Sequence, residues 1–217
     1  ALEAADHIGM DIKGAEVAVE GFGNVGTFVA EHLYKFGARV IAVSDRKGVI
    51  YNENGLDPAK LLRIKESTGS VVNYTPGKVL NGKDIFELEM DILIPAALSD
   101  VITSENVDKV RAKIVIEASN IPMKPDMERV LFRRGILVVP DFVANAGGVI
   151  SSYAEYRGYN PKQMFRTVET KLRNNVRLVL EVSRQKGLMP RDVALEIAGK
   201  RVRKAMERKG KRRRVKS

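Results

Sequence analysis

Short apolar runs alternate with helix-like segments as far as residue 140. The apolar runs predict buried strands at residues 15–20, 39–43, 91–94, 113–116 and 136–139. Segments with apolar residues every three or four positions predict helices at 2–8, 25–36, 58–66, 104–110 and 124–134, with one or two helical turns at 84–88. Residues 48–51 predict a short strand-like extension, and 69–81 are expected to be irregular. The alternation predicts an α/β fold, a mostly parallel sheet with helices on both faces.

The last part of the chain predicts helices alone, at 146–156, 161–186 and 190–208. We therefore expect one domain over residues 1–208 that ends in a helical extension from about residue 145. Ten of the 37 Lys and Arg residues fall within 201–217, beside a single acid, so this end carries nearly all of the net charge of +10. We expect residues 209–217 to be a disordered basic tail, because they cannot bury a core.

A glycine-rich turn follows the first predicted strand, in the order Gly21, Gly23 and Gly26, and a predicted helix starts near Asn24. In such a turn the first glycine permits the tight bend, and the second lets the backbone approach a pyrophosphate. The third allows the helix to pack close to the strand. The free N–H groups at the start of the helix would then face the phosphates. The turn predicts a Rossmann-like, doubly wound domain that binds a dinucleotide.

An acidic residue, Asp45, ends the second predicted strand, where a carboxylate can accept hydrogen bonds from an adenosine ribose. This residue favours the free 2′-hydroxyl of NAD. Arg46 and Lys47 follow directly and could pair with a 2′-phosphate, or could be solvated loop cations. The sequence therefore favours NAD as the cofactor and leaves NADP open.

Composition excludes several classes of protein. The 217 residues include no cysteine, so disulfides and thiolate metal sites are excluded, and the two histidines are not spaced as metal ligands. We expect no metal site. No apolar run approaches the length of a membrane span and no signal peptide is visible, so we expect a cytoplasmic protein without a membrane partner.

A second group of residues follows the last predicted strand, over 138–149. Pro140 ends the strand, Asn145 can both donate and accept hydrogen bonds, and Gly147 and Gly148 permit close approach of the backbone. Residues 140–149 and 21–26 together resemble the cofactor-binding, C-terminal domain of the hexameric glutamate dehydrogenases. The resemblance extends from Ala1 to about Lys209 and includes residues 93–98, 117–122 and 191–194.

The resemblance implies roles for individual residues. The residues that would hold the cofactor are Gly21, Phe22, Gly23, Asn24, Val25, Gly26, Asp45, Arg46, Ala96, Ala97, Asn120 and Asn145. Within this set, Ala96 and Ala97 line the path to the ribose beside the nicotinamide, and Asn120 and Asn145 contact the nicotinamide end. Val149 and Ser152 would reach the substrate side chain. The chain departs from the family pattern at Ala118–Ser119, Ile121 and Met123–Lys124, all beside Asn120.

The family's reaction is the reversible NAD(P)-dependent oxidative deamination of L-glutamate to 2-oxoglutarate and ammonia. Its catalytic residues and most substrate contacts belong to an N-terminal domain that this sequence lacks, so we expect no catalytic residue here. The resemblance thus implies an amino-acid dehydrogenase of which this chain alone binds the cofactor without turnover. The resemblance also implies a homo-hexamer for the full-length protein, with glutamate bound only when the other domain is present.

Two other functions remain open from the sequence. The chain could belong to a leucine, phenylalanine or valine dehydrogenase, although Ser152 favours an acidic substrate side chain. It could instead be a non-catalytic nucleotide-binding protein whose basic tail binds nucleic acid. Because no aromatic residues interleave with the charges of residues 209–217, we expect a solubilising tail and no nucleic-acid partner.

Overall fold

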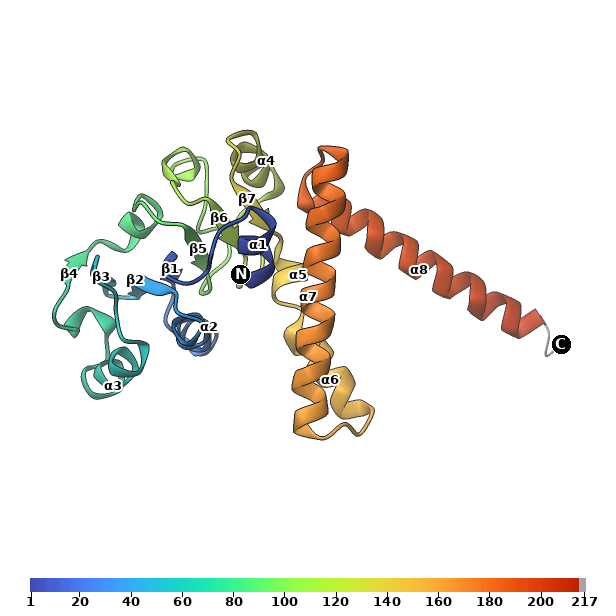
Figure 1. The fold of residues 1–217 in the computed structure, drawn as a ribbon, viewed down its shortest axis with the longest axis horizontal. Coiled ribbons are helices and arrows are strands. Elements are labelled where there is room, and N and C mark those ends of the chain that lie inside the picture. Colours follow the sequence, from blue (N-terminus) through green and yellow to red (C-terminus); the bar gives the residue numbers. More distant parts are fainter. Residues whose placement is uncertain (215–217) are drawn as a thin grey trace.

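A computed structural model describes residues 1–214 of the chain, with side-chain surroundings as far as residue 207. One seven-stranded sheet runs through its centre in the order β4-β3-β2-β1-β5-β6-β7 (Figure 1). The strands are β1 (Glu16–Glu20), β2 (Arg39–Asp45), β3 (Gly48–Tyr51), β4 (Lys78–Leu80), β5 (Ile92–Pro95), β6 (Ile114–Ile116) and β7 (Leu137–Val139). Five neighbouring strands are parallel, namely β2, β1, β5, β6 and β7. Strands β3 and β4 add an antiparallel edge beside β2. The predicted α/β fold is confirmed.

Helices surround this sheet and continue beyond it. They are α1 (Leu2–His7), α2 (Asn24–Lys35), α3 (Pro58–Thr68), α4 (Pro125–Arg133), α5 (Asp141–Ala144), α6 (Gly147–Tyr156), α7 (Pro161–Lys186) and α8 (Pro190–Arg214). Three short 3-10 turns complete the described chain, at η1 (Val71–Asn73), η2 (Gly82–Phe86) and η3 (Val107–Lys109). Local signals fix several ends: the Asp57 side chain caps α3, and Gly187 ends α7 in a left-handed conformation.

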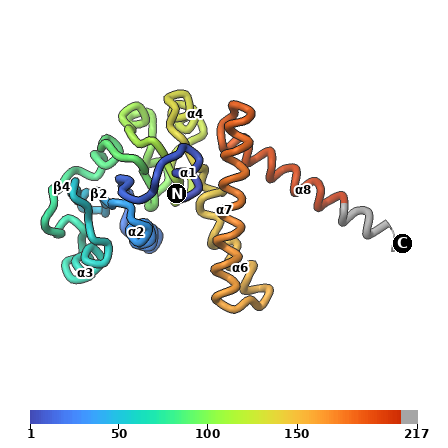
Figure 2. Tube along the Cα trace, in the orientation of Figure 1, coloured from blue at the N-terminus to red at the C-terminus, as the bar shows by residue number. Residues whose placement is uncertain are grey.

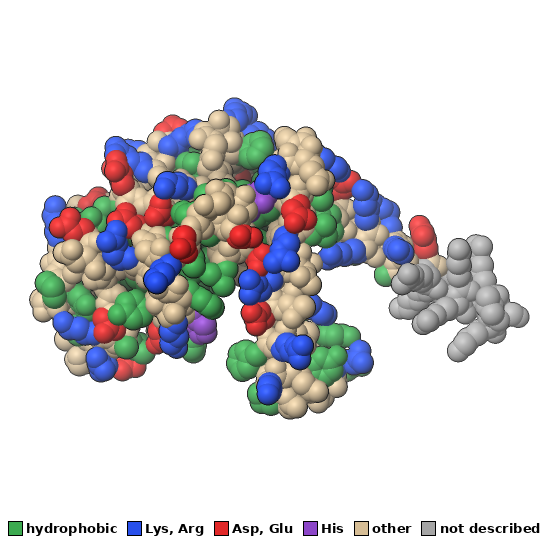
Figure 3. Space-filling view, in the orientation of Figure 1, with side chains coloured by type: hydrophobic (Ala, Val, Ile, Leu, Met, Phe, Trp, Pro, Cys, Tyr) green, Lys and Arg blue, Asp and Glu red, His purple; other side chains and the backbone are tan. Residues whose placement is uncertain are grey.

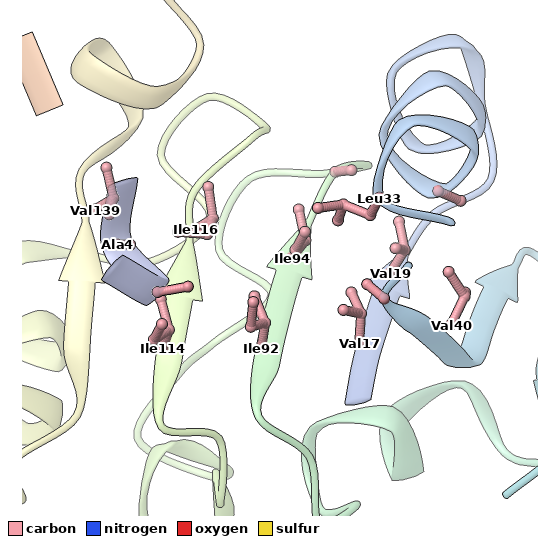
Figure 4. Close-up of a cluster of buried hydrophobic side chains, with 14 of the residues drawn as sticks. Ala4, Val17, Val19, Leu33, Val40, Ile92, Ile94, Ile114, Ile116 and Val139 are labelled. Carbon is pink, nitrogen blue, oxygen red and sulfur yellow. The ribbon is translucent and has the colours of Figure 1, made fainter. Parts of the chain in front are cut away.

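The core lies in two layers, one on each face of the sheet. On one face, side chains such as Val17, Ile92 and Ile114 pack against α1, α2 and α7, and Figure 4 shows Ala4 of α1 beside Val139. On the other face, residues such as Leu93 and Val115 pack against α4 and the turns η2 and η3. The parallel strands are buried on both faces, which explains why their sequences are apolar runs without alternation.

The helical extension stands beside the β7 edge of the sheet. Helices α6 and α7 form a hairpin, and α8 runs away from the body of the molecule (Figures 1 and 2). Apolar side chains gather at the tip of this hairpin in Figure 3, and Tyr156 there is 86% exposed. In the middle of α7, Arg173 and Arg177 pair with the buried Glu3 carboxylate of α1, at 2.6 Å and 2.9 Å. These pairs tie the first helix to the extension.

Four sequence expectations differ from the structure. Residues 69–81 were expected to be irregular, yet they contain η1 and strand β4, which pairs with β3 at the sheet edge. The predicted helix at 104–110 reduces to the 3-10 turn η3, and the turns at 84–88 become the 3-10 turn η2. Residues 209–217 were expected to be a disordered tail, whereas the structure continues α8 through residues 209–214. Residues 215–217 lie outside the described part of the chain.

Candidate functional site

The turn after β1 lies at the point where the sheet changes direction. The chain builds β2 on one side of β1 and then crosses to build β5 on the other. Open parallel sheets bind ligands in the crevice at such a point, beyond the carboxyl ends of the strands. Gly21 occupies this place with a φ of +91°, and its N–H donates to Ser44 Oγ at 2.9 Å. A Cβ atom on Gly21 would lie 2.4 Å from the Cβ of Ala97, so the strand ends meet too closely for any side chain.

The other two glycines of the turn have opposite surroundings. A Cβ on Gly26 would lie 1.8 Å from the carbonyl oxygen of Gly21, so helix α2 packs directly onto the turn. A Cβ on Gly23 would meet nothing within 4 Å, because this residue faces open space. Gly23 is also the N-cap of α2 and provides no side-chain cap for the first N–H groups of that helix. The turn therefore combines a tight internal contact with an open backbone surface at a helix N-terminus, which attracts anions.

A cavity of about 610 Å³ opens in front of this turn. Six of the predicted cofactor residues line it, namely Gly21, Phe22, Gly23, Asp45, Arg46 and Ala97. The other lining residues are Glu20, Ser44, Lys47, Lys65, Gly69 and Leu98. Asn24, Val25 and Gly26 form the first turn of α2 directly behind Gly23. The structure thus gathers most of the predicted diphosphate and adenosine residues around one hollow.

Asp45 lines the cavity, and hydrogen bonds from the protein also hold its carboxylate in place. Its Oδ1 accepts from the Lys47 N–H at 2.8 Å, and its Oδ2 accepts from the Val71 N–H at 2.8 Å and from the Ser70 hydroxyl at 2.8 Å. Partial burial opposes ionisation, but these donors outweigh it and hold the pKa of Asp45 below its usual value. The Ser70 hydroxyl also lies 3.1 Å from Oδ1, so three groups share a carboxylate that can accept about four hydrogen bonds, which leaves room for one more donor such as a ribose hydroxyl.

Two charged residues in the cavity were missed by the sequence analysis. Lys65 comes from α3, where its Nζ donates to the carbonyl oxygen of Phe22 and lies 5.8 Å from the centroid of the Phe22 ring. Glu20 is the last residue of β1, and its Oε2 accepts from the Ala97 N–H at 3.3 Å. Burial raises the pKa of Glu20, because it disfavours the charged carboxylate. The position of Glu20 directly before Gly21 could have marked it as a site residue in the sequence. No motif around Lys65 marks that residue.

The predicted nicotinamide residues form a second group beside the cavity. Asn145 Nδ2 donates to Asn120 Oδ1 at 2.9 Å, which joins the ends of β6 and β7 through their loops. The carbonyl oxygen of Asn120 accepts from Ser99 Oγ at 2.8 Å, and this contact links the pair to the loop that follows β5. The next residue, Ile121, has a φ of +48°, in the region that favours glycine. The structure therefore brings Asn120 and Asn145 together.

The remaining predicted residues lie at the margins. Ala96 is buried at the end of β5, where its N–H donates to the carbonyl oxygen of Glu20 at 2.8 Å. Val149 and Ser152 lie on α6; Val149 is 77% exposed, and Ser152 Oγ donates to the carbonyl oxygen of Gly148 at 3.1 Å. Neither α6 residue lines the cavity in front of the glycine turn.

Within residues 1–214, no helix is both long and apolar enough to cross a membrane. The same part of the chain contains no group of three or more His, Cys, Asp or Glu side chains that could hold a metal ion.

The fold and the site together define a Rossmann-type domain: an open, mostly parallel sheet with a glycine turn and a helix N-terminus at its switch point. A family model described as glutamate/leucine/phenylalanine/valine dehydrogenase matches residues 1–210. The chain therefore belongs to the glutamate/leucine/phenylalanine/valine dehydrogenase family.

Curated relatives agree with this family. A glutamate dehydrogenase of Aeropyrum pernix is 41% identical over 210 residues, covering 92% of this chain and 50% of the relative. An NADP-specific glutamate dehydrogenase of Saccharolobus shibatae is 38% identical, covering 97% of this chain and 52% of the relative. An NAD-specific glutamate dehydrogenase of Staphylococcus aureus is 39% identical, covering 96% of this chain and 51% of the relative. The chain spans about half the length of the curated relatives it matches.

A solved structure shows the same architecture. The hetero-hexameric glutamate dehydrogenase from Thermus thermophilus, in a leucine-bound form, superposes with a TM-score of 0.84 at 34% identity. The match covers 94% of this chain and 50% of that one.

Proposed function

We propose that residues 1–208 form the cofactor-binding domain of a glutamate dehydrogenase, and that the domain binds a pyridine dinucleotide at the glycine turn. The observation that carries this proposal is the contrast within the turn. Gly21 and Gly26 have no room for a Cβ, whereas Gly23 opens onto the cavity at the N-terminus of α2. This contrast fits a turn shaped to bring bare backbone N–H groups against a diphosphate.

The adenosine end of the dinucleotide would lie beside Asp45. The ionised carboxylate can accept a hydrogen bond from a ribose hydroxyl and repels a 2′-phosphate. Arg46, Lys47 and Lys65 line the same cavity and would attract that phosphate. We propose NAD as the cofactor, with NADP also accommodated. The names of the relatives support both, since one is NAD-specific and another NADP-specific.

The nicotinamide end would extend past Ala96 and Ala97 towards Asn120 and Asn145. A primary amide has two donors and one acceptor oxygen, so the paired asparagines can bind and orient the carboxamide of the ring. When bound, the nicotinamide supplies the hydride chemistry of the reaction. Val149 and Ser152 on α6 would face the substrate, and the Ser152 hydroxyl suits a carboxylate side chain such as that of glutamate.

The reaction we propose for the whole protein is the reversible oxidative deamination of L-glutamate, performed in a hexamer. A dehydrogenase of this kind closes two domains around its substrate to exclude water and align the reacting atoms. Because the chain spans about half of its relatives, we propose that it binds the cofactor but does not turn glutamate over by itself. Glutamate-dependent formation of NADH by the purified chain would refute this part of the proposal.

The dinucleotide site is tested by substituting Gly23→Ala. The added methyl group meets no protein atom and the φ of Gly23 is −83°, so the fold should persist. The methyl group would stand where the diphosphate approaches, so we expect the affinity for NAD⁺ in calorimetry to fall at least about tenfold.

The matched control is Gly82→Ala, the same change at a glycine whose added Cβ also meets nothing and which does not line the cavity in front of the glycine turn. We expect this variant to bind NAD⁺ as the unchanged chain does. Equal affinity in the Gly23→Ala variant, with an unchanged melting temperature, would contradict the proposed diphosphate site.

A further inference from the structure

A buried ionic cluster lies behind the paired asparagines. Arg191, the second residue of α8, donates from Nε to Glu128 Oε1 at 2.5 Å. Its Nη2 donates to Glu117 Oε2 at 2.9 Å and to Asp141 Oδ1 at 2.9 Å. The three carboxylates come from the end of β6, from α4 and from the start of α5. One guanidinium thus joins four separate elements.

The cluster is more costly than simple anchoring of a helix requires. Glu117 is fully buried, Glu128 is 3% exposed and the Arg191 side chain is 13% exposed. Three carboxylates surround one cation, and apolar side chains of similar size usually stabilise such a site at least as well. Burial together with the neighbouring Glu128 raises the pKa of Glu117 to about 8. An arrangement of this kind points to a role that apolar packing could not perform.

Hydrogen bonds lead from the cluster directly to the asparagine pair. Asp141 Oδ2 accepts from the N–H of Ile121 at 3.0 Å, which fixes the residue after Asn120 in its positive-φ conformation. The carbonyl oxygen of Asp141 accepts from the N–H of Asn145 at 2.8 Å. The Asp141 N–H itself donates to Glu117 Oε2 at 2.7 Å. Asp141 therefore contacts the backbone on both sides of the Asn120–Asn145 bond.

We propose that Arg191 is a positioning residue for the nicotinamide end of the site: by holding Asp141, it fixes the Asn120–Asn145 pair in the orientation that binds the carboxamide. This inference rests on the proposed function. It also connects the start of α8 to the site, although α8 contributes no residue to the main cavity.

Comparing the affinities for NAD⁺ and for ADP-ribose separates positioning of the nicotinamide end from a merely structural role of Arg191. ADP-ribose contains the adenosine and the diphosphate but lacks the nicotinamide ring. Loss of positioning should weaken NAD⁺ and leave ADP-ribose unchanged, whereas loosening of the whole fold should weaken both. The ratio of the two dissociation constants, measured by calorimetry on the full chain, isolates the nicotinamide end.

The primary variant is Arg191→Lys, because the compact ammonium group keeps the charge but cannot reproduce the planar fork that donates from Nε to Glu128 and from Nη2 to Glu117 and Asp141. We expect the affinity for NAD⁺ to fall about 3- to 10-fold, the loss that one misplaced hydrogen-bonding pair produces, with ADP-ribose unaffected. The control is Arg173→Lys, the same change at an ion-paired arginine of α7 remote from the asparagines. An equal loss for both ligands, or no loss for either, would overturn the proposal.

A second variant keeps the proposal testable if Arg191→Lys does not fold. Asp141→Asn leaves the bonds from Arg191 to Glu117 and Glu128, but its single amide oxygen cannot serve both Ile121 and Arg191. The same selective loss of NAD⁺ affinity is expected, and its absence would contradict the inference.

A ligand-free measurement separates this inference from the proposed function. We expect the side-chain amide resonances of Asn120 and Asn145 to shift in the Arg191→Lys or Asp141→Asn variant and not in Arg173→Lys. Unchanged resonances would refute positioning by Arg191. If the unchanged chain binds neither NAD⁺ nor ADP-ribose, the proposed function fails, and the resonances still decide whether Arg191 orients the pair.

Discussion

At the scale of single residues, the glycines of the turn differ in what a side chain at each position would meet. Gly26 touches the carbonyl oxygen of Gly21, so a side chain there would separate α2 from β1. Gly23 touches no protein atom, so its lack of a side chain has no structural explanation and fits a ligand. The sequence predicted both glycines from their spacing, but only the structure distinguishes the packing glycine from the one that faces the cavity.

Glu20 provides a prediction at this scale. Its carboxylate lines the cavity, and burial raises its pKa, so Glu20 becomes charged at a higher pH than an ordinary glutamate. The negative charge would then repel the diphosphate, so affinity for NAD⁺ should fall with pH. We expect Glu20→Gln to bind NAD⁺ about 3- to 10-fold more tightly at pH 8, with a smaller gain at pH 5. Calorimetry at both values tests this, and a gain that is independent of pH would contradict the assignment.

At the scale of elements, the sequence predicted what depends on local pattern. Strands β1, β2, β5, β6 and β7 were predicted because each is an apolar run buried on both faces. Strand β4 was missed because it lies at the sheet edge, where Val79 is 55% exposed, and it forms only by pairing with β3. The basic residues of 209–214 suggested a tail, yet they continue the helix begun at Pro190. Charge opposes burial but does not prevent a helix.

The residues of the candidate site also fall into those that a local sequence pattern predicts and those that only the tertiary structure brings together. The residues from Gly21 to Gly26 follow one another in the sequence, so a motif reveals them. Lys65 reaches Phe22 from 43 positions away, and Arg191 reaches Glu117 across 74 positions. No pattern within a single element encodes such contacts, because they arise only when the strands are placed in their order in the sheet.

The junction of α4, β6, α5 and α8 gives a prediction for stability. Burial raises the pKa of Glu117 to about 8 and that of Glu128 to about 7, while Asp141, Asp192 and Arg191 carry the other charges nearby. The unfolded chain loses these protons near pH 4.5, whereas the folded protein keeps them until the pH approaches about 7 for Glu128 and about 8 for Glu117, so stability falls as the pH rises through this range.

Replacing Glu117→Gln should remove part of this fall. We expect its free energy of unfolding, relative to the unchanged chain, to rise by about 1–3 kcal/mol between pH 5 and pH 8 in urea titrations. Glu196→Gln is the control, because its lysine partners lower the pKa of Glu196 to about 2 and it stays ionised throughout. A difference that does not change with pH would show that Glu117 is ionised in the folded protein.

At the scale of the whole molecule, the candidate site lies along one edge of the sheet. The cavity and the asparagine pair lie beyond the carboxyl ends of the parallel strands, and helix α6 begins at Gly147, shortly after Asn145. In our proposal these residues bind and orient a dinucleotide, and the reaction of the whole protein also requires groups that face the substrate from another direction.

The most direct test of the central claim follows the backbone amides of the folded chain by NMR as NAD⁺ is added. We expect saturable shifts concentrated at Gly23, Asn24 and Val25, where the turn meets the first N–H groups of α2, with smaller shifts around Asp45 and Asn145. An absence of shifts at millimolar NAD⁺, or shifts confined to another surface such as that around Gly82, would contradict it.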